Sequence, residues 1–307
     1  MNIPQLKSTT AGRISGSARR LALLHSGVAL GASFVLTVIN FLLSKPLAQT
    51  GGLSGIGTRV ILTSVQSIMA LLLTVAMPFW DLGFVHGTVR LAKEEPAGAK
   101  DLLEGFRRLG PALRLMLLRA LFVGALAFFC IQAVSTVYLF SPFSGGLMEQ
   151  MEAILTEEML ASGEMSNLEA LLPSLYPVYI ISGMVLIALL IPLFYRFRLA
   201  DTAIMDGAPG ALAALRHSAK AMKGNVFSFF KLDLSFWWYY LLLALSVALA
   251  YGDVALEWLK VPANETVAYF GFYALSIIGQ LLLAWRCAAT VHTTYAAAYL
   301  ELSREIQ

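Results

Sequence analysis

Six long apolar stretches limit how this chain can fold more than any other feature of its sequence. They cover residues 21–43, 60–79, 113–140, 176–195, 231–250 and 267–285. A helix needs ~20 apolar residues to cross the hydrocarbon core of a bilayer. Of the 307 residues, 58% are hydrophobic and 13% are charged, and that charged share is roughly half that of a soluble domain. The sequence therefore predicts an all-α membrane protein with six transmembrane helices, and we expect residues 1–307 to form one membrane domain.

The distribution of basic residues gives these helices a direction. When the six stretches cross the membrane in turn, the connections between them alternate between two sides. One side receives 19 of the 22 lysine and arginine residues, and the other receives only Lys45, Arg59 and Lys260. Basic connections stay in the cytoplasm, so both termini are expected there. The basic N-terminus resembles that of a signal peptide, but residues 21–43 are too long an apolar stretch for one, so we expect an uncleaved first span.

Two basic amphipathic segments precede the third and fifth spans. Residues 96–110 and 209–224 both begin with proline and end with glycine, and in both the apolar side chains recur at helical spacing. Basic residues beside an apolar face are typical of helices that lie on a membrane surface. We therefore expect two interfacial helices, each followed by two spans as an internal repeat. The residues expected to bind lipid headgroups are Arg107, Arg108, Arg216, Lys220 and Lys223.

The connection between the third and fourth spans, residues 141–173, is acidic. It contains six glutamates and no lysine or arginine. The predicted topology places it outside the cell. Two interpretations are open: a receptor surface for cationic ligands or divalent ions, and an acidic solvated surface over the ends of the spans.

Polar residues are scarce within the predicted spans. Ionisable groups are missing from the middle of every span, which argues against a proton pump with a buried carboxylate. Gln66, Gln132 and Gln280 do lie within spans. These amides either line a solute path or form ordinary hydrogen bonds between packed helices.

Asp233 lies near the start of the fifth span, two residues after Lys231. Residues two apart on a helix do not face each other, so the two are not expected to form an ion pair. The simpler expectation is an unpartnered carboxylate at the membrane interface. The alternative is a pair with a basic residue of another repeat, such as Arg119 or Arg286.

The sequence contains no recognisable catalytic or metal-binding pattern. None of the four histidines has a Cys, Asp or Glu at the spacing of a metal site. A nucleophile elbow, a phosphate-binding loop and a zinc-protease motif are also missing. We therefore expect no enzyme activity, no cofactor, no metal and no nucleic-acid partner.

One part of the chain resembles a known family. The residues concerned are Ile191-Pro192, Tyr195, Leu199-Ala200-Asp201, the run from Ser218 to Gly224, the run from Phe230 to Phe236, and Trp238. They resemble the signature of the membrane family called domain of unknown function 975. The resemblance implies a multi-span protein of a bacterial inner membrane, without an assigned activity. Similar membrane regions are found fused to glycerophosphodiester phosphodiesterases, which by analogy implies an accessory role near lipids.

Two kinds of function are compatible with these features. The first is a non-enzymatic accessory or scaffold protein whose basic helices bind anionic lipids at the cytoplasmic face and position a membrane-protein partner or a second copy of the chain. The second is a small-solute transporter or channel whose path runs between the repeats and is lined by Gln66, Gln132 and Gln280.

Overall fold

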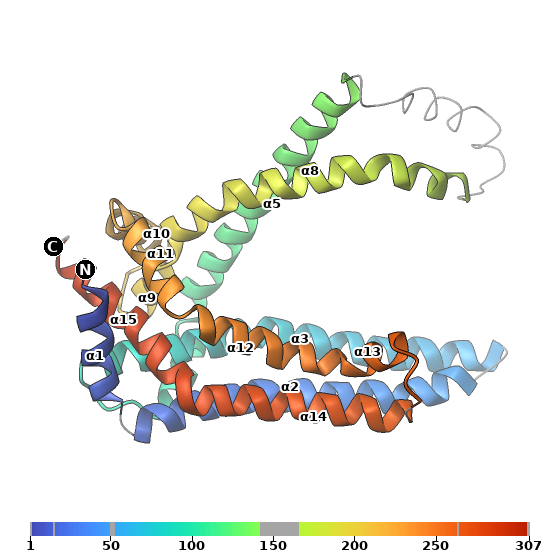
Figure 1. Cartoon of the computed structure of the whole chain (residues 1–307), viewed down its shortest axis with the longest axis horizontal. Coiled ribbons are helices and arrows are strands. Elements are labelled where there is room, and N and C mark those ends of the chain that lie inside the picture. The colour runs from blue at the N-terminus through green and yellow to red at the C-terminus, as the bar shows by residue number, and fades with distance from the viewer. Residues whose placement is uncertain (1, 15, 50–52, 142–165, 263, 306–307) are drawn as a thin grey trace. The chain divides into compact units, whose positions relative to one another are not determined.

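A computed structural model (Figure 1) describes residues 2–14, 16–49, 53–141, 166–262 and 264–305. These residues form helices and turns, and none of them is in a strand. Six helices are long and apolar enough to cross a membrane, which confirms the predicted fold class. They are Gly16–Leu42, Thr63–Ala92, Leu109–Leu139, Tyr176–Met205, Trp237–Trp258 and Thr266–Arg304.

The chain divides into two compact units. The first unit contains Met1–Leu113 and Arg198–Gln307, and the second contains Arg114–Phe197. The expectation of one membrane domain over residues 1–307 stays a prediction. Of the acidic segment 141–173, residues 142–165 lie outside the described residues, so both interpretations of that segment stay predictions too.

The second unit consists of most of α5 (Leu109–Leu139) together with α8 (Ser166–Phe197). A guanidinium nitrogen of Arg119 on α5 donates a hydrogen bond to the carbonyl oxygen of Phe197 at 2.9 Å. The rings of Phe122 and Phe197 lie 6.3 Å apart. Most of the remaining large apolar side chains of this unit are exposed, as expected for helices whose solvent is lipid.

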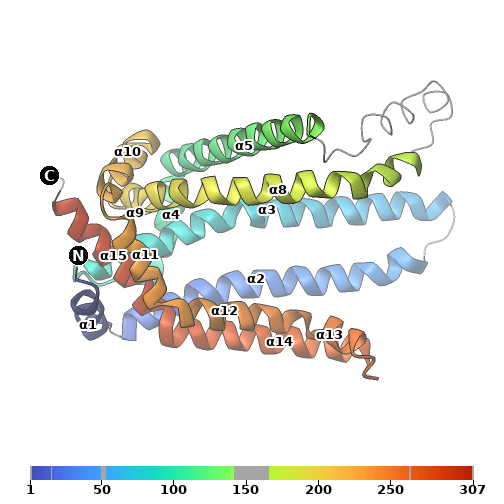
Figure 2. The same cartoon turned by 45° about the horizontal axis from the view of Figure 1, so that its top comes forward.

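The first unit is built around four helices that belong to membrane-length segments and run side by side (Figures 1 and 2). These are α2 (Gly16–Gln49), α3 (Leu53–Ala92), α12 (Trp237–Ala248) and α14 (Glu265–Leu283). Helix α2 contacts both α3 and α14, and α14 contacts α12. The turn η3 (Leu249–Tyr251) and the short helix α13 (Gly252–Trp258) follow α12 and pack against α14.

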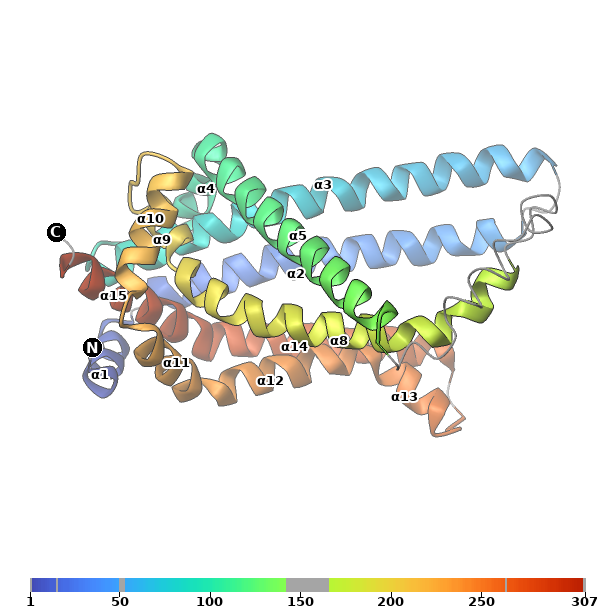
Figure 3. The ribbon, with the colours of Figure 1, turned by 90° about the horizontal axis from the view of Figure 1, so that it is seen from above.

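Shorter elements gather at the end of this unit where both chain termini lie, which we call the terminal end (Figures 1 and 3). They are α1 (Ile3–Arg13), η1 (Ala99–Leu103), α4 (Glu104–Arg107), α9 (Ala200–Met205), α10 (Ala211–Met222), α11 (Val226–Ser235) and α15 (Ala289–Arg304). The fully buried large side chains are concentrated here, among them Leu102, Ile204, Met222, Phe229 and Leu302. The sides of the long helices instead expose leucine and valine, which lipid covers in a bilayer.

Two glycines allow η1 and α4 to pack directly on α3. A β-carbon on Gly83 of α3 would lie 1.9 Å from the carbonyl oxygen of Leu102, and one on Gly105 would lie 1.9 Å from that of Phe79. Any side chain at either position would push the two backbones apart. This contact folds the connection after α3 back along the helix.

Helices α14 and α15 are joined without a break by a π-helical turn, η4 (Ala284–Ala288). Such a turn inserts an extra residue into the helical ladder and bends the helix. Figure 1 shows α15 leaving the direction of α14 at this point. The bend carries α15 into the core of the terminal end, where it contacts α1, α3 and α10.

The fifth span departs from the expected single helix over residues 231–250. Helix α11 ends at Ser235 and α12 begins at Trp237, with Phe236 between them at φ −113° and ψ 14°. The membrane-length helix therefore begins at Trp237 rather than at Lys231. The first basic segment also differs, because it forms the short elements η1 and α4 instead of one helix. The surface position of both basic segments and the internal repeat stay predictions.

Candidate functional site

The second basic segment forms α10, and its charged and buried residues lie on opposite faces. Arg216 and Lys220 are exposed and lie four residues apart, which places them on one side of the helix. Lys223, also exposed, is the residue that follows the last turn of α10. The buried side consists of Ala211, Ala214, Leu215, Ser218, Ala221 and Met222. The helix therefore presents its cationic side chains to the surroundings and its small apolar ones to the protein.

Two side chains fix the rotation of α10. The backbone N–H of Leu199, just before α9, donates to the hydroxyl oxygen of Ser218 at 3.1 Å. His217 Nε2 lies 3.0 Å from the hydroxyl oxygen of Ser303 on α15, and its ring stands edge-on to that of Tyr299. The Ser218 bond is made from the buried side and the His217 bond from its edge, so together they hold the basic side outward.

Helix α11, which follows the basic residues of α10, carries exposed aromatic residues. Gly224, at φ +82°, makes the turn between the two helices in a conformation that favours glycine. Phe227 is 65% exposed and Phe230 is 47% exposed. The ammonium group of Lys231 lies 4.6 Å from the centre of the Phe227 ring. Cationic and aromatic side chains in this order are typical of segments at a membrane–water interface.

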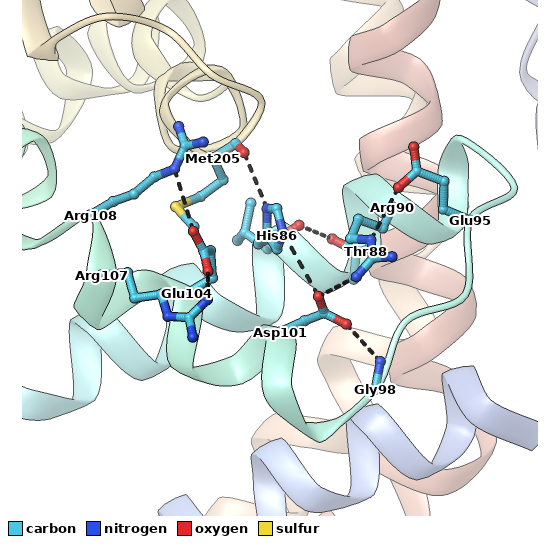
Figure 4. Close-up of polar contacts among 11 residues, drawn as sticks. His86, Thr88, Arg90, Glu95, Gly98, Asp101, Glu104, Arg107, Arg108 and Met205 are labelled. Atoms are coloured by element: carbon cyan, nitrogen blue, oxygen red, sulfur yellow. Dashed lines mark hydrogen bonds and ion pairs between the residues drawn. The ribbon is translucent and has the colours of Figure 1, made fainter.

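The two arginines of the first basic segment have different surroundings. The Arg107 side chain is 79% exposed, and a guanidinium nitrogen lies 3.3 Å from a carboxylate oxygen of Glu104. Arg108 donates to the carbonyl oxygen of Ile204 in α9 at 2.8 Å and lies near Glu104 (Figure 4). Arg108 therefore fastens α4 to α9, whereas Arg107 points to the surroundings. Lipid binding by either residue stays a prediction.

Asp101 holds together a polar cluster between α3 and η1 (Figure 4). One carboxylate oxygen accepts a hydrogen bond from Arg90 at 2.7 Å, and the other accepts the backbone N–H of Gly98 at 2.7 Å. Arg90 also pairs with Glu95 at 3.1 Å, and His86 Nδ1 lies 3.2 Å from the carbonyl oxygen of Met205. Each group has a partner within the protein, so the cluster serves to fold the connection after α3.

The three glutamines predicted to line a path lie on three helices. Gln66 is half-buried on α3 and Gln280 is half-buried on α14, and both of these helices contact α2. The Gln280 amide donates to the hydroxyl oxygen of Ser276 on its own helix at 3.0 Å. Gln132 is exposed on α5 in the second unit. A role in transport stays a prediction for all three.

The expectation that Asp233 lacks a partner is wrong. Its carboxylate pairs with the guanidinium group of Arg198 and accepts a hydrogen bond from the hydroxyl of Tyr295. Tyr295 also shares a hydrogen bond with the hydroxyl of Tyr240 at 3.0 Å, and Arg198 lies over the Tyr295 ring at 4.5 Å. The cluster links the start of the α9 segment, α11, α12 and α15.

The partners in this cluster cannot be predicted from the sequence. Arg198 and Tyr295 lie 35 and 62 residues from Asp233 in the chain, and only the fold brings them together. Within the residues that the structure describes, no three His, Cys, Asp or Glu side chains converge as a metal site requires.

Comparison with known families covers most of the chain. A family model described as "Protein of unknown function (DUF975)" matches residues 11–280, a range that includes α2 to α12 and most of α14. The segment whose sequence resembles that family, from Ile191 to Trp238, forms the end of α8, the basic helix α10 and the helix α11 that carries Asp233. Comparisons with curated proteins and with solved structures found no match. On the extent of the family match, the chain belongs to the DUF975 family of proteins of unknown function.

Proposed function

We propose that this chain is a non-enzymatic accessory or scaffold protein of a bacterial inner membrane, which binds anionic lipid headgroups at the cytoplasmic face through its basic segments. The observation that carries the proposal is the geometry of α10. Two of its exposed basic residues share one side and the third, Lys223, follows its last turn, while Ser218 and His217 fix the helix to the residue before α9 and to α15. The cationic side therefore needs no rearrangement to meet a layer of phosphates. A membrane-protein partner or a second copy of the chain would be positioned by the same contact.

The energetics are sufficient for a preference among lipids. Near an anionic membrane surface, each lysine or arginine contributes about 1 kcal/mol of attraction. Arg216, Lys220 and Lys223 together therefore contribute about 3 kcal/mol, or a factor of roughly 100 between anionic and neutral lipid. Phe227 and Phe230 add apolar contact at the depth where aromatic side chains anchor membrane proteins.

The test compares two lipids on the purified full-length protein. Phosphatidylglycerol and phosphatidylcholine are added in turn to the protein in a neutral detergent, and the melting temperature is recorded. We expect phosphatidylglycerol to raise the melting temperature more than phosphatidylcholine does. This difference should be lost in the R216Q/K220Q/K223Q variant, because the three charges that distinguish the lipids are gone.

The matched control is K260Q, which removes an exposed lysine at the far end of the first unit, after α13. This variant should keep the full difference between the two lipids. Equal melting temperatures in the two lipids for the unaltered protein would contradict the proposal.

A further inference from the structure

The sequence of the fifth span explains its break only in part, through the Ser235 hydroxyl, which donates to the carbonyl oxygen of Leu232 at 2.7 Å. Residues 226–248 contain neither proline nor glycine, which together with π-turns and inserted side chains account for most sharp helix kinks. The stretch is also strongly apolar, which favours one continuous helix in a membrane because every backbone group must find a partner there. Contacts from elsewhere in the protein also hold α11 at an angle to α12, among them those of Asp233 with Arg198 and Tyr295.

The hydrogen bonds at Phe236 show which backbone group the break releases. In a continuous helix the N–H of Tyr239 would donate to the carbonyl oxygen of Ser235. Here it donates to the carbonyl oxygen of Phe236 at 2.9 Å. The Ser235 oxygen has thus lost its helical donor and needs another.

Lys7 of α1 supplies that donor. Its ammonium group donates to the carbonyl oxygen of Ser235 at 3.2 Å, and it lies 4.3 Å from the centre of the Phe236 ring. One side chain therefore satisfies the released carbonyl and also binds the ring at the break, through a cation–π contact. A charged donor is well suited to an oxygen that would otherwise be left without a partner.

Helix α1 is itself held in place by α15. The buried hydroxyl groups of Thr10 and Thr294 share a hydrogen bond of 2.9 Å. Tyr295, the next residue on α15, donates to Asp233 of α11. The N-terminal helix is thus connected to the broken span directly through Lys7 and indirectly through α15.

We propose that α1 is a latch that holds the fifth span in its broken form, and that its release lets α11 and α12 join into one helix from Val226 to Ala248. In the joined helix the Tyr239 N–H would donate to the Ser235 oxygen, so this oxygen would keep a hydrogen-bond donor after Lys7 has left. The united helix would be about 34 Å long at 1.5 Å per residue, enough to cross the hydrocarbon core. Joining would also swing α11 into line with α12, which moves the exposed Phe227 and Phe230 and takes the buried Phe229 and Leu232 out of their present contacts. The latch stands on contacts within the protein and does not require the proposed lipid binding.

Spin labels can report the angle between the two helices in the full-length protein. Phe227 and Leu245 are both exposed, so each can be replaced by a labelled cysteine in a C130A/C287A background. A straight helix places their α-carbons about 27 Å apart, and any bend shortens this distance. The distance between the two labels is measured by pulsed electron paramagnetic resonance in detergent. In the labelled protein that keeps Lys7 and Thr10, we expect it to be shorter than in a straight helix.

Lys7→Met removes the donor and the charge while keeping the length of the side chain. We expect K7M to lengthen the distance towards that of the straight helix, whereas K7R should keep the short one because it retains a donor and a cation. T10V removes the hydroxyl that binds α1 to α15 and should produce a mixture of the short and long distances. It provides a second test of the proposal if K7M does not fold. K100M removes an exposed lysine of η1 and should change nothing. The proposal is overturned if K7M and T10V both keep the short distance, or if K7M shortens it further.

Discussion

At the scale of single residues, the most informative side chain is Asp233. A carboxylate at the edge of a membrane span is tolerated when it meets water, but one that is enclosed needs a partner. The Asp233 side chain is 20% exposed and that of Arg198 is 17% exposed, so neither charge is well hydrated. Their ion pair and the Tyr295 hydroxyl together satisfy a carboxylate that would otherwise be costly to enclose.

Asp233→Asn should therefore destabilise the protein strongly. The substitution keeps the shape of the side chain but leaves the guanidinium group of Arg198 enclosed without its counter-charge. Removing one partner of an enclosed pair costs about 3 kcal/mol, which detergent-titrated unfolding monitored by tryptophan fluorescence can measure. The control is K231Q, which removes an exposed charge two residues away and should cost well under about 1 kcal/mol. A D233N protein as stable as the original would show that the pair contributes little.

At the scale of elements, close backbone contact decides how the connection after α3 folds. Gly83 and Gly105 lie against each other's segments, and a β-carbon on Gly105 would also lie 2.9 Å from the backbone nitrogen of Gly83. The contact involves main-chain atoms, which cannot rotate out of the way as a side chain can. It brings Asp101 to Arg90 and so completes the polar cluster of Figure 4.

Gly105→Ala should separate η1 and α4 from α3. Overpacking alone costs about 1–3 kcal/mol, and a clash with backbone lies at the upper end of that range. We expect a lower melting temperature for the purified protein in detergent, together with faster amide exchange in residues 98–107. Gly110→Ala is the matched control, because a β-carbon there meets nothing within 4 Å and alanine favours a helix. Its melting temperature should be unchanged or higher.

The elements also show how far the sequence can predict such a fold. The six apolar stretches and the basic side of α10 could be predicted from the sequence. The first depend on a run of apolar residues within one segment, and the second depends on the helical spacing of basic residues within one segment. The break at Phe236 could not, because its hydrogen-bond donor comes from Lys7, more than 220 residues away. The partner of Asp233 and the irregular form of the first basic segment were hidden for the same reason, since both depend on contacts between distant parts of the chain.

At the scale of the whole molecule, the six membrane-length helices found among the described residues predict that both termini lie on one side of the membrane. Which side that is depends on the distribution of lysine and arginine. Helix α10 and helix α13, which Lys260 follows, lie at opposite ends of the first unit (Figure 1), so residues of α10 and Lys260 can be used to report the orientation.

Labelling of single cysteines in intact bacterial cells tests the orientation. In a C130A/C287A background, K260C should react with a membrane-impermeant maleimide added outside the cells. K220C should react only after the cells are permeabilised, because basic connections remain in the cytoplasm. The reverse pattern would place the basic side of α10 outside the cell and would exclude a cytoplasmic role for it.

The length of α3 has one more consequence. Its 40 residues, which include Pro78, make a helix of about 60 Å at 1.5 Å per residue, whereas the hydrocarbon layer is ~30 Å thick. Even at a tilt of about 40°, the steepest usually seen, the helix is ~15 Å longer along the membrane normal than the hydrocarbon layer is thick. Its last turns are braced against α15 by Val89, Ala92 and Ala296. The excess length of α3 therefore belongs to the packed terminal end, where the contact with α15 stiffens the part of the first unit that lies beyond the hydrocarbon.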